Sequence, residues 1–254
     1  MKIGLIGAGR IGSAVVKGLL KSGIVPTDIL VKNSRHKTAE KLVDQYELTL
    51  VNDDQKFQDC AVVLIAIHGD AVLQVVHNLA DVYHGIIVSF GGGDIEAINQ
   101  QIAPASFVLA TPNTAVEISQ GIVPVSFAAT ESDTNKSIVE KLFERLGQVY
   151  VVNPELQGAY GTLAGCTPAY LAVMLDALSD AGALTGISRA QADKIIKQMV
   201  LGTAQLLQET DLSFGELKDY TATPGGSTIK GVVALEENNF RNAVIKAVQA
   251  ANGK

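Results

Sequence analysis

The sequence is poor in cysteine, tryptophan and blocks of positive charge. It contains two cysteines and no tryptophan among 254 residues. Cys60 and Cys166 lie far apart without metal-ligand spacing, which argues against a disulfide framework and a structural zinc, so no metal is expected. The formal net charge is −6, and no run of lysine and arginine occurs. These absences argue against a nucleic-acid partner and an anionic membrane surface.

Long uninterrupted hydrophobic runs are also missing. The longest apolar region, 163–187, contains Asp176 and Asp180, which argues against a transmembrane span. The opening MKIGLIGAGR is short in apolar residues and interrupted by glycine, unlike a signal peptide. With 47% hydrophobic and 18% charged residues, the sequence predicts a globular, cytoplasmic protein without a membrane partner.

Short apolar runs recur through the first 152 residues, with helical patterns between them. The runs are nearly continuous rather than alternating, which is typical of strands covered on both faces. Val72, Val76 and Leu79 have the spacing of one helix face. This alternation predicts an α/β fold, a doubly wound Rossmann-type sheet domain over residues 1–152. The expected strands are 2–6, 28–31, 61–67, 86–90, 107–110, 123–129 and 149–152.

After residue 152 only helical spacing is found, which predicts an all-α domain over residues 153–254. The helix expected at 169–186 is apolar or small on nearly every side. A domain of about 100 residues has too little interior to bury such a helix. We therefore expect a homodimer, or a larger assembly of dimers, formed through this domain. Two pairs with capping-box spacing mark further helix starts: Ser188 with Gln191, and Ser213 with Glu216.

A glycine-rich motif, GAGRIG, follows the first apolar strand and precedes a helix. Only glycine lets such a turn close and lets the backbone approach a pyrophosphate, which then faces the helix N-terminus. The motif therefore predicts a dinucleotide site. Its residues are Gly7, Ala8, Gly9, Arg10, Ile11 and Gly12.

The second strand lacks the acidic residue that binds the ribose of NAD at its end. Asn33, Ser34 and Arg35 stand there instead. These groups can bind a 2′-phosphate, which a carboxylate would repel, so NADP is expected, with NAD as the alternative. His68 ends the fourth strand at the ligand edge of the sheet. For His68, contact with the cofactor and a merely structural or exposed role are both open.

Three further motifs, TPNTA, GCTPAY and TPGGSTIKG, occur in this order. With them, the chain resembles the pyrroline-5-carboxylate reductase family over nearly its whole length. The family reduces Δ1-pyrroline-5-carboxylate to proline with NADPH or NADH, and its helical domain dimerises by interleaving. The resemblance implies an oxidoreductase of proline biosynthesis, acting on a cyclic imine amino acid.

The resemblance also implies roles for individual residues. Glu155 matches an acidic residue that contacts the substrate nitrogen, and Thr162 matches a threonine proposed as a proton donor. The substrate carboxylate is expected at Thr223, Gly226, Ser227 and Thr228. Besides the glycine motif and Ser34, the cofactor is expected along Ala66, Ile67, His68, Phe90, Gly91, Gly92, Pro112 and Asn113.

The loop TATPGGST, residues 221–228, can be explained in two ways. Gly225 and Gly226 let the backbone approach a ligand, and the next helix offers its N-terminus to a carboxylate. Alternatively, Ser227 and Thr228 only cap a helix that follows a Pro-Gly turn.

Several positions depart from the family pattern and leave the substrate open. His68 replaces a usual lysine, and Tyr220 replaces an asparagine that reaches the substrate. The alternatives are another cyclic imine as substrate, or an NADP-binding protein without catalysis. β-Hydroxyacid dehydrogenases need a helical-domain lysine with asparagine four residues on, and short-chain dehydrogenases need Tyr-x-x-x-Lys; the sequence has neither.

Overall fold

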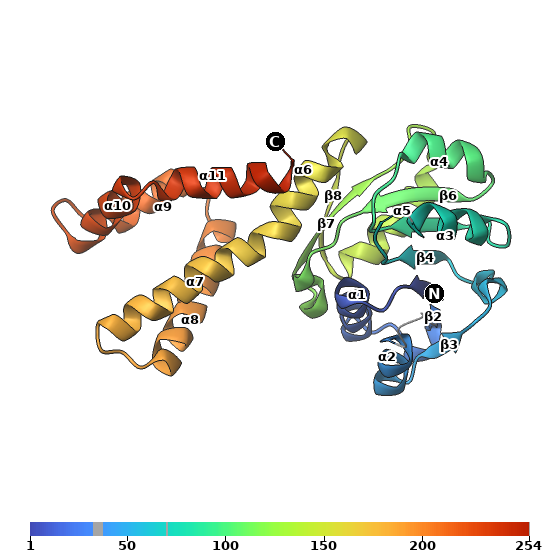
Figure 1. The fold of residues 1–254 in the computed structure, drawn as a ribbon, viewed down its shortest axis with the longest axis horizontal. Coiled ribbons are helices and arrows are strands. Elements are labelled where there is room, and N and C mark those ends of the chain that lie inside the picture. The colour runs from blue at the N-terminus through green and yellow to red at the C-terminus, as the bar shows by residue number, and fades with distance from the viewer. Residues whose placement is uncertain (33–37, 70, 254) are drawn as a thin grey trace. The chain divides into compact units, whose positions relative to one another are not determined.

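The computed structural model describes residues 1–32, 38–69 and 71–253. They form two compact units, Met1–Gly165 and Cys166–Lys254. Figure 1 shows that the first is built on a sheet and the second on helices alone. Residues 154–165 belong to the first unit, and Gln157 and Ala164 hydrogen-bond to its strands and loops. The domain boundary after residue 152 stays a prediction.

Within the described ranges, the first unit contains one eight-stranded sheet in the order β3-β2-β1-β4-β5-β6-β7-β8. Its neighbouring strands are parallel except for the antiparallel pair β6–β7, so the predicted doubly wound sheet is confirmed. The sequence missed β3, a run of three residues on a half-covered edge of the sheet. The strands are β1 Ile3–Ile6, β2 Ile29–Lys32, β3 Thr49–Val51, β4 Val62–Ile65, β5 Ile86–Ser89, β6 Ser106–Ala110, β7 Gly121–Ser126 and β8 Gly147–Val151.

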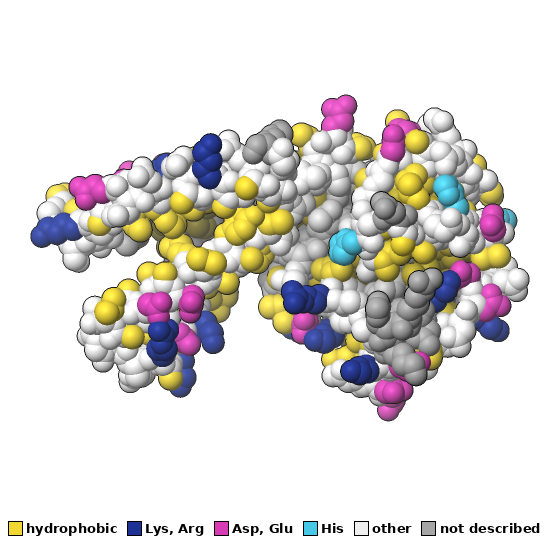
Figure 2. Space-filling model, viewed as in Figure 1, with side chains coloured by type: hydrophobic (Ala, Val, Ile, Leu, Met, Phe, Trp, Pro, Cys, Tyr) yellow, Lys and Arg dark blue, Asp and Glu magenta, His cyan; other side chains and the backbone are white. Residues whose placement is uncertain are grey.

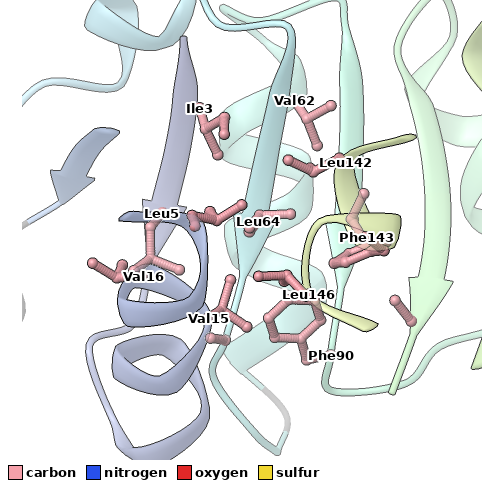
Figure 3. Packing of buried hydrophobic residues seen from close by; sticks show 14 of the residues in the cluster. Ile3, Leu5, Val15, Val16, Val62, Leu64, Phe90, Leu142, Phe143 and Leu146 are labelled. Carbon is pink, nitrogen blue, oxygen red and sulfur yellow. The ribbon is translucent and has the colours of Figure 1, made fainter. Parts of the chain in front are cut away.

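Helices cover both faces of the sheet. Because side chains alternate along a strand, Val62 and Leu64 of β4 join one buried cluster, and Val63 and Ile65 join another. The first cluster includes residues of α1, α2 and α5, and Figure 3 shows Val15 of α1 and Phe143 of α5 packing within it. The second includes residues of α3 and α4. These helices are α1 Arg10–Lys21, α2 Thr38–Tyr46, α3 Ala71–Ala80, α4 Ile95–Ile102 and α5 Asp133–Glu144.

Short helical turns connect β6 to β7 and lead from β8 to the second unit. The 3₁₀ turn η3, Thr114–Ile118, links β6 to β7. After β8 the chain forms the 3₁₀ turn η4, Pro154–Leu156, and helix α6, Gln157–Gly161. A π-helical turn, Thr162–Cys166, follows directly.

The second unit is helical throughout its described residues, as predicted. The capping box of Ser213 and Glu216 is present at the start of α9. Ser188 is the N-cap residue of α8, so the helix start predicted there is confirmed; its hydroxyl donates to the Gln191 side chain at 2.8 Å and caps no backbone N–H. The helices are α7 Thr167–Leu184, α8 Arg189–Glu209, α9 Phe214–Thr221, α10 Ser227–Glu237 and α11 Phe240–Ala251.

Helix α7 is the apolar helix that the sequence predicted at 169–186. Most of its side chains are not buried within the chain. Of its residues only Ser179 is buried, whereas Val173 is 73% and Leu184 is 89% exposed. Figure 2 shows hydrophobic side chains gathered along this helix and on α11. Such a surface indicates an interaction site.

The same apolar character makes the run Pro154–Leu184 pass a test for membrane spans. It is long enough, and its mean hydropathy is 1.2. A core helix of a water-soluble protein passes the same test, so this is weak evidence for a span. The absence of a membrane span stays a prediction.

Candidate functional site

The strand order of the sheet reverses at β1. The chain runs from β1 to β2 and β3 on one side, and returns to β4 on the other. In open α/β sheets, ligands bind where the strand order reverses in this way. The turn between β1 and α1, which carries the glycine motif, lies at this point.

The three glycines of this motif have different surroundings. Gly7 has a φ of +105°, and a Cβ on Gly12 would lie 2.0 Å from the Gly7 carbonyl oxygen, so both glycines are required by the fold. A Cβ on Gly9 would meet no described atom within 4 Å. Gly9 is the N-cap of α1, with no described side chain bonded to the cap and no acidic residue in the first turn. This open helix start, which has Arg10 as its first residue and no acidic residue in its first turn, fits a pyrophosphate.

The ends of β4 and β5 extend the same edge. His68 is exposed there. A Cβ on Gly91 would lie 2.5 Å from the Ile67 carbonyl oxygen, and Gly92 has a φ of +84° with open space beside it. Phe90 points away from the edge, because its ring packs against Phe143 with ring centres 6.2 Å apart. Phe90 can therefore contact a ligand at this edge only through its backbone atoms.

Pro112 and Asn113, at the end of β6, are buried rather than open. The Asn113 side-chain oxygen accepts a hydrogen bond from the Ile122 backbone N–H at 3.2 Å. Its side-chain nitrogen donates to the Ala164 carbonyl oxygen at 3.3 Å. Both ends of the amide are thus engaged within the protein, as is the Asn113 backbone N–H, which donates to the Ile122 carbonyl oxygen at 3.2 Å, and the cofactor contact of Asn113 stays a prediction.

Gln157, which the sequence did not single out, lies beside this segment and bonds to Thr111. The buried Gln157 side chain donates to the Thr111 hydroxyl at 2.9 Å and to the Pro124 carbonyl oxygen at 3.1 Å. Its oxygen accepts from the buried Ser126 hydroxyl at 2.8 Å. An amide on an otherwise apolar buried helix face is the only sequence signal for such a residue.

Glu155 and Thr162 flank Gln157 in the first unit. Glu155 is exposed in η4, and its backbone N–H donates to the Asn153 side chain at 3.0 Å. Thr162 is buried at the start of the π-helical turn. The structure thus brings Thr162 and Asn113 into one hydrogen-bonded region, through Ala164 of the same turn.

The second strand contributes one ion pair that the structure describes. Lys32 ends β2 and pairs with Asp54, with nitrogen and oxygen 2.6 Å apart. Asn33, Ser34 and Arg35, the expected 2′-phosphate site, lie outside the described residues. Among the described residues, no group of three metal-ligating side chains is found.

The loop before α10 has the geometry of a close-approach site. Gly225 has a φ of +72°, and a Cβ on Gly226 would lie 2.5 Å from the Thr223 hydroxyl oxygen. Gly226 is the N-cap of α10, and no described side chain caps this helix end. Ser227 and Thr228 occupy the first turn and are exposed. Since glycine holds the cap position, simple helix capping does not explain Thr228.

Two family models match the two ends of the chain. Residues 2–93 match the model described as NADP oxidoreductase, coenzyme F420-dependent. Residues 154–254 match pyrroline-5-carboxylate reductase dimerisation.

Full-length relatives carry one name. The chain is 31% identical to the pyrroline-5-carboxylate reductase of Escherichia coli, over 97% of this chain and 94% of that protein. It is 30% identical to the enzyme of that name from Synechocystis, over 99% of this chain and 96% of that protein. A solved structure of the Plasmodium falciparum pyrroline carboxylate reductase with NADP bound has a TM-score of 0.87 at 24% identity, covering 100% of this chain and 96% of that one.

The sheet, the glycine turn where its strand order reverses, the helical second unit and the two matching family models together define a Rossmann-type oxidoreductase with a dimerisation region. Within that class, the chain belongs to the pyrroline-5-carboxylate reductase family. The resemblance seen in the sequence motifs is thereby confirmed.

Proposed function

We propose that the chain reduces Δ1-pyrroline-5-carboxylate to L-proline with NADPH. The observation that carries the proposal is the full-length similarity to the Escherichia coli enzyme, which spans both units. The glycine turn and the open N-terminus of α1 add a physical reason, since they fit the pyrophosphate of a dinucleotide. NAD is the alternative cofactor.

The sheet domain binds and orients the cofactor. The helix start at Gly9 holds the pyrophosphate, and Asn33, Ser34 and Arg35 hold the 2′-phosphate. The strand ends at His68 and Gly92 continue the binding edge. Backbone atoms of Pro112 and Asn113 lie at the nicotinamide. When bound, NADPH supplies the hydride for the reaction.

The substrate is held by its two charged ends. The backbone at Gly226, with the hydroxyls of Thr223, Ser227 and Thr228, binds the carboxylate at the N-terminus of α10. Glu155 orients the ring nitrogen. Hydride adds to the imine carbon, the C=N π pair becomes a lone pair on nitrogen, and that nitrogen takes a proton from Thr162 or arrives already protonated.

We further propose a cytoplasmic homodimer, or an assembly of dimers, formed through residues 153–254, with neither a nucleic acid nor a membrane as partner. The exposed apolar side chains of α7 support this proposal, as does the dimerisation model that matches residues 154–254. Light scattering at low micromolar concentration tests the assembly.

Steady-state oxidation of NADPH with a panel of five- and six-membered cyclic imine acids tests the activity. Turnover is expected to be fastest with Δ1-pyrroline-5-carboxylate, with L-proline as the product by chromatography. His68 and Tyr220, both exposed, favour a second candidate, another cyclic imine. A faster six-membered substrate would establish that candidate, and NADPH binding without any turnover would reduce the chain to a binding protein.

The cofactor preference has its own test at Arg35. Replacing Arg35 with alanine removes a guanidinium–phosphate contact, so the NADPH affinity is expected to fall roughly tenfold. The NADH affinity should stay unchanged, because NADH has no 2′-phosphate. Equal weakening of both cofactors in fluorescence titrations would contradict the assignment.

A further inference from the structure

We propose that Gln157 is a positioning residue for the imine reduction. It joins helix α6, and the π-helical turn carrying Thr162, to the end of strand β6 at Thr111. This inference rests on the proposed function and deepens it, since it names what holds the proton donor beside the nicotinamide segment.

The contacts of Gln157 show how the connection is made. Its side-chain nitrogen donates to the Thr111 hydroxyl at 2.9 Å and to the Pro124 carbonyl oxygen at 3.1 Å. Its side-chain oxygen accepts from the Ser126 hydroxyl at 2.8 Å. Thr111 directly follows β6, and Pro124 and Ser126 lie in its antiparallel neighbour β7. One side chain therefore fixes the first residue of α6 to two strands.

Neighbouring contacts make the connection specific to the site. Thr111 directly precedes Pro112 and Asn113, the segment assigned to the nicotinamide. A Cβ on Gly161, the last residue of α6, would lie 2.9 Å from the Thr111 methyl carbon, so this helix packs closely on Thr111. Thr162 follows immediately. The second connection, from Asn113 to Ala164 at 3.3 Å, reaches the same turn.

The burial of Gln157 makes its hydrogen bonds costly to break. Gln157 is 7% exposed and Ser126 is fully buried, so a hydrogen bond broken between these two side chains is not replaced by water, whereas Thr111 is half-buried. Displacing a catalytic group by about 1 Å can lower a rate by two orders of magnitude. Loosening Gln157 should therefore slow the chemical step without weakening cofactor binding.

The sharpest test replaces Thr111 and leaves residue 157 a glutamine. Thr111→Val removes the hydroxyl at nearly constant shape, and Thr111→Ser restores it. With the full-length protein, kcat is expected to fall roughly tenfold or more in Thr111→Val, with the NADPH dissociation constant within about twofold of the parent. The isotope effect on kcat with C4-deuterated NADPH should rise, because hydride transfer becomes rate-limiting. Thr111→Ser should recover most of the rate.

Gln157→Met and a matched control separate positioning from general stability. Asn99 also makes three hydrogen bonds through its amide, to Ile95 and to both backbone groups of Phe107, in the same unit. Asn99→Leu should lower the melting temperature but leave the isotope effect unchanged. Gln157→Met should change both, and combining it with Thr111→Val should add little, since both break one connection.

Hydrogen exchange of residues 157–166 gives a readout that needs no substrate. Faster exchange there in Thr111→Val than in Thr111→Ser is expected whether or not the parent reduces a pyrroline. An inactive parent would overturn the proposed function and leave this arm standing. An active parent whose Thr111→Val variant keeps the parent kcat, isotope effect and exchange would overturn the role of Gln157 alone.

Discussion

The two units bury their hydrophobic residues to different degrees. In the sheet unit, every residue of β1, β4 and β5 is buried, and helices cover both faces. In the helical unit, α7 has one buried residue, and α9, α10 and α11 have none. The sheet unit therefore completes its own core, whereas the helical unit presents a surface that another chain must cover.

Two glycines from each unit illustrate the same contrast, which Gly9 of the sheet unit and Gly226 of the helical unit do not follow. In the sheet unit, Gly12 and Gly91 lie so close to backbone carbonyls that a Cβ would clash. In the helical unit, Gly202 and Gly231 lie within helices and have no described atom within 4 Å of a built Cβ. The first pair is explained by the fold of a single chain, and the second pair is not.

The largest expected effect comes from a charge placed on α7. Val173→Lys puts the charge on a side chain that is 73% exposed, and lysine favours helix more than valine, so an isolated chain would lose no stability. In an assembly that buries α7, an unpaired charge costs several kcal/mol, and light scattering should show loss of the dimer.

Leu73 provides the matched control for this substitution. It is an exposed apolar residue of α3 in the sheet unit, 46% exposed. Leu73→Lys should change the melting temperature little and leave the assembly intact. If both variants keep the parent's size and stability, the helical unit needs no partner, and the contrast between the units fails.

The next effect concerns the loop before α10. If Thr228 binds the substrate carboxylate, Thr228→Ala should lower kcat/KM by roughly tenfold to a hundredfold, since a hydrogen bond to a charged group contributes about 1.5–3 kcal/mol. NADPH binding should be unchanged, and Thr228→Ser should keep most of the activity. Normal kinetics with a lower melting temperature would make the residue purely structural.

A smaller effect separates fold from ligand within the glycine motif. Gly9 has a φ of −75° and open space around it, so Gly9→Ala should leave the melting temperature nearly unchanged. A bound pyrophosphate would meet the new methyl group, and NADPH affinity should fall about tenfold. Gly12→Ala should instead lower the melting temperature, because its Cβ meets the Gly7 carbonyl. Unchanged NADPH affinity in Gly9→Ala would place the phosphates elsewhere.

Local signals explain which features the sequence could predict. Three features each depend on residues that are neighbours in the sequence: the glycine motif, the buried runs of β1 and β4, and the break between α9 and α10. All three are present in the structure. The three-residue strand β3 has no comparable pattern, since one of its residues is exposed and only one is buried.

The contacts that the sequence could not predict join residues far apart in the chain. Gln157 meets Thr111, which is 46 residues away, and Asn113 meets Ala164 across 51 residues. Neither pair has a spacing rule. The spacing of Ser188 and Gln191 predicted the start of α8 but not their contact, because the two side chains bond to each other instead of to the backbone.

The smallest effect uses the two cysteines, one in each unit. Cys60 is buried in the sheet unit, and burial raises the pKa of its thiol from 9.0 to about 11. Lys2 opposes this shift in pKa, and Asp59 adds to it. Because the folded state holds the proton more tightly, this stabilisation is complete below pH 9 and is lost as the pH rises towards 11.

After allowing for solvent screening, the free energy of unfolding should fall by about 1–2 kcal/mol over this range. Tyr83, whose hydroxyl donates to the Cys60 carbonyl oxygen at 3.1 Å, also has a raised pKa, so the interval from pH 9 to 10 best isolates the thiol. Urea unfolding at fixed protein concentration should show a shallower pH dependence in Cys60→Ala than in the parent. The control is Cys166→Ala, at a half-exposed cysteine of the helical unit. Equal slopes in the parent and Cys60→Ala would mean that the thiol of the sheet unit is less enclosed than its position in the core indicates.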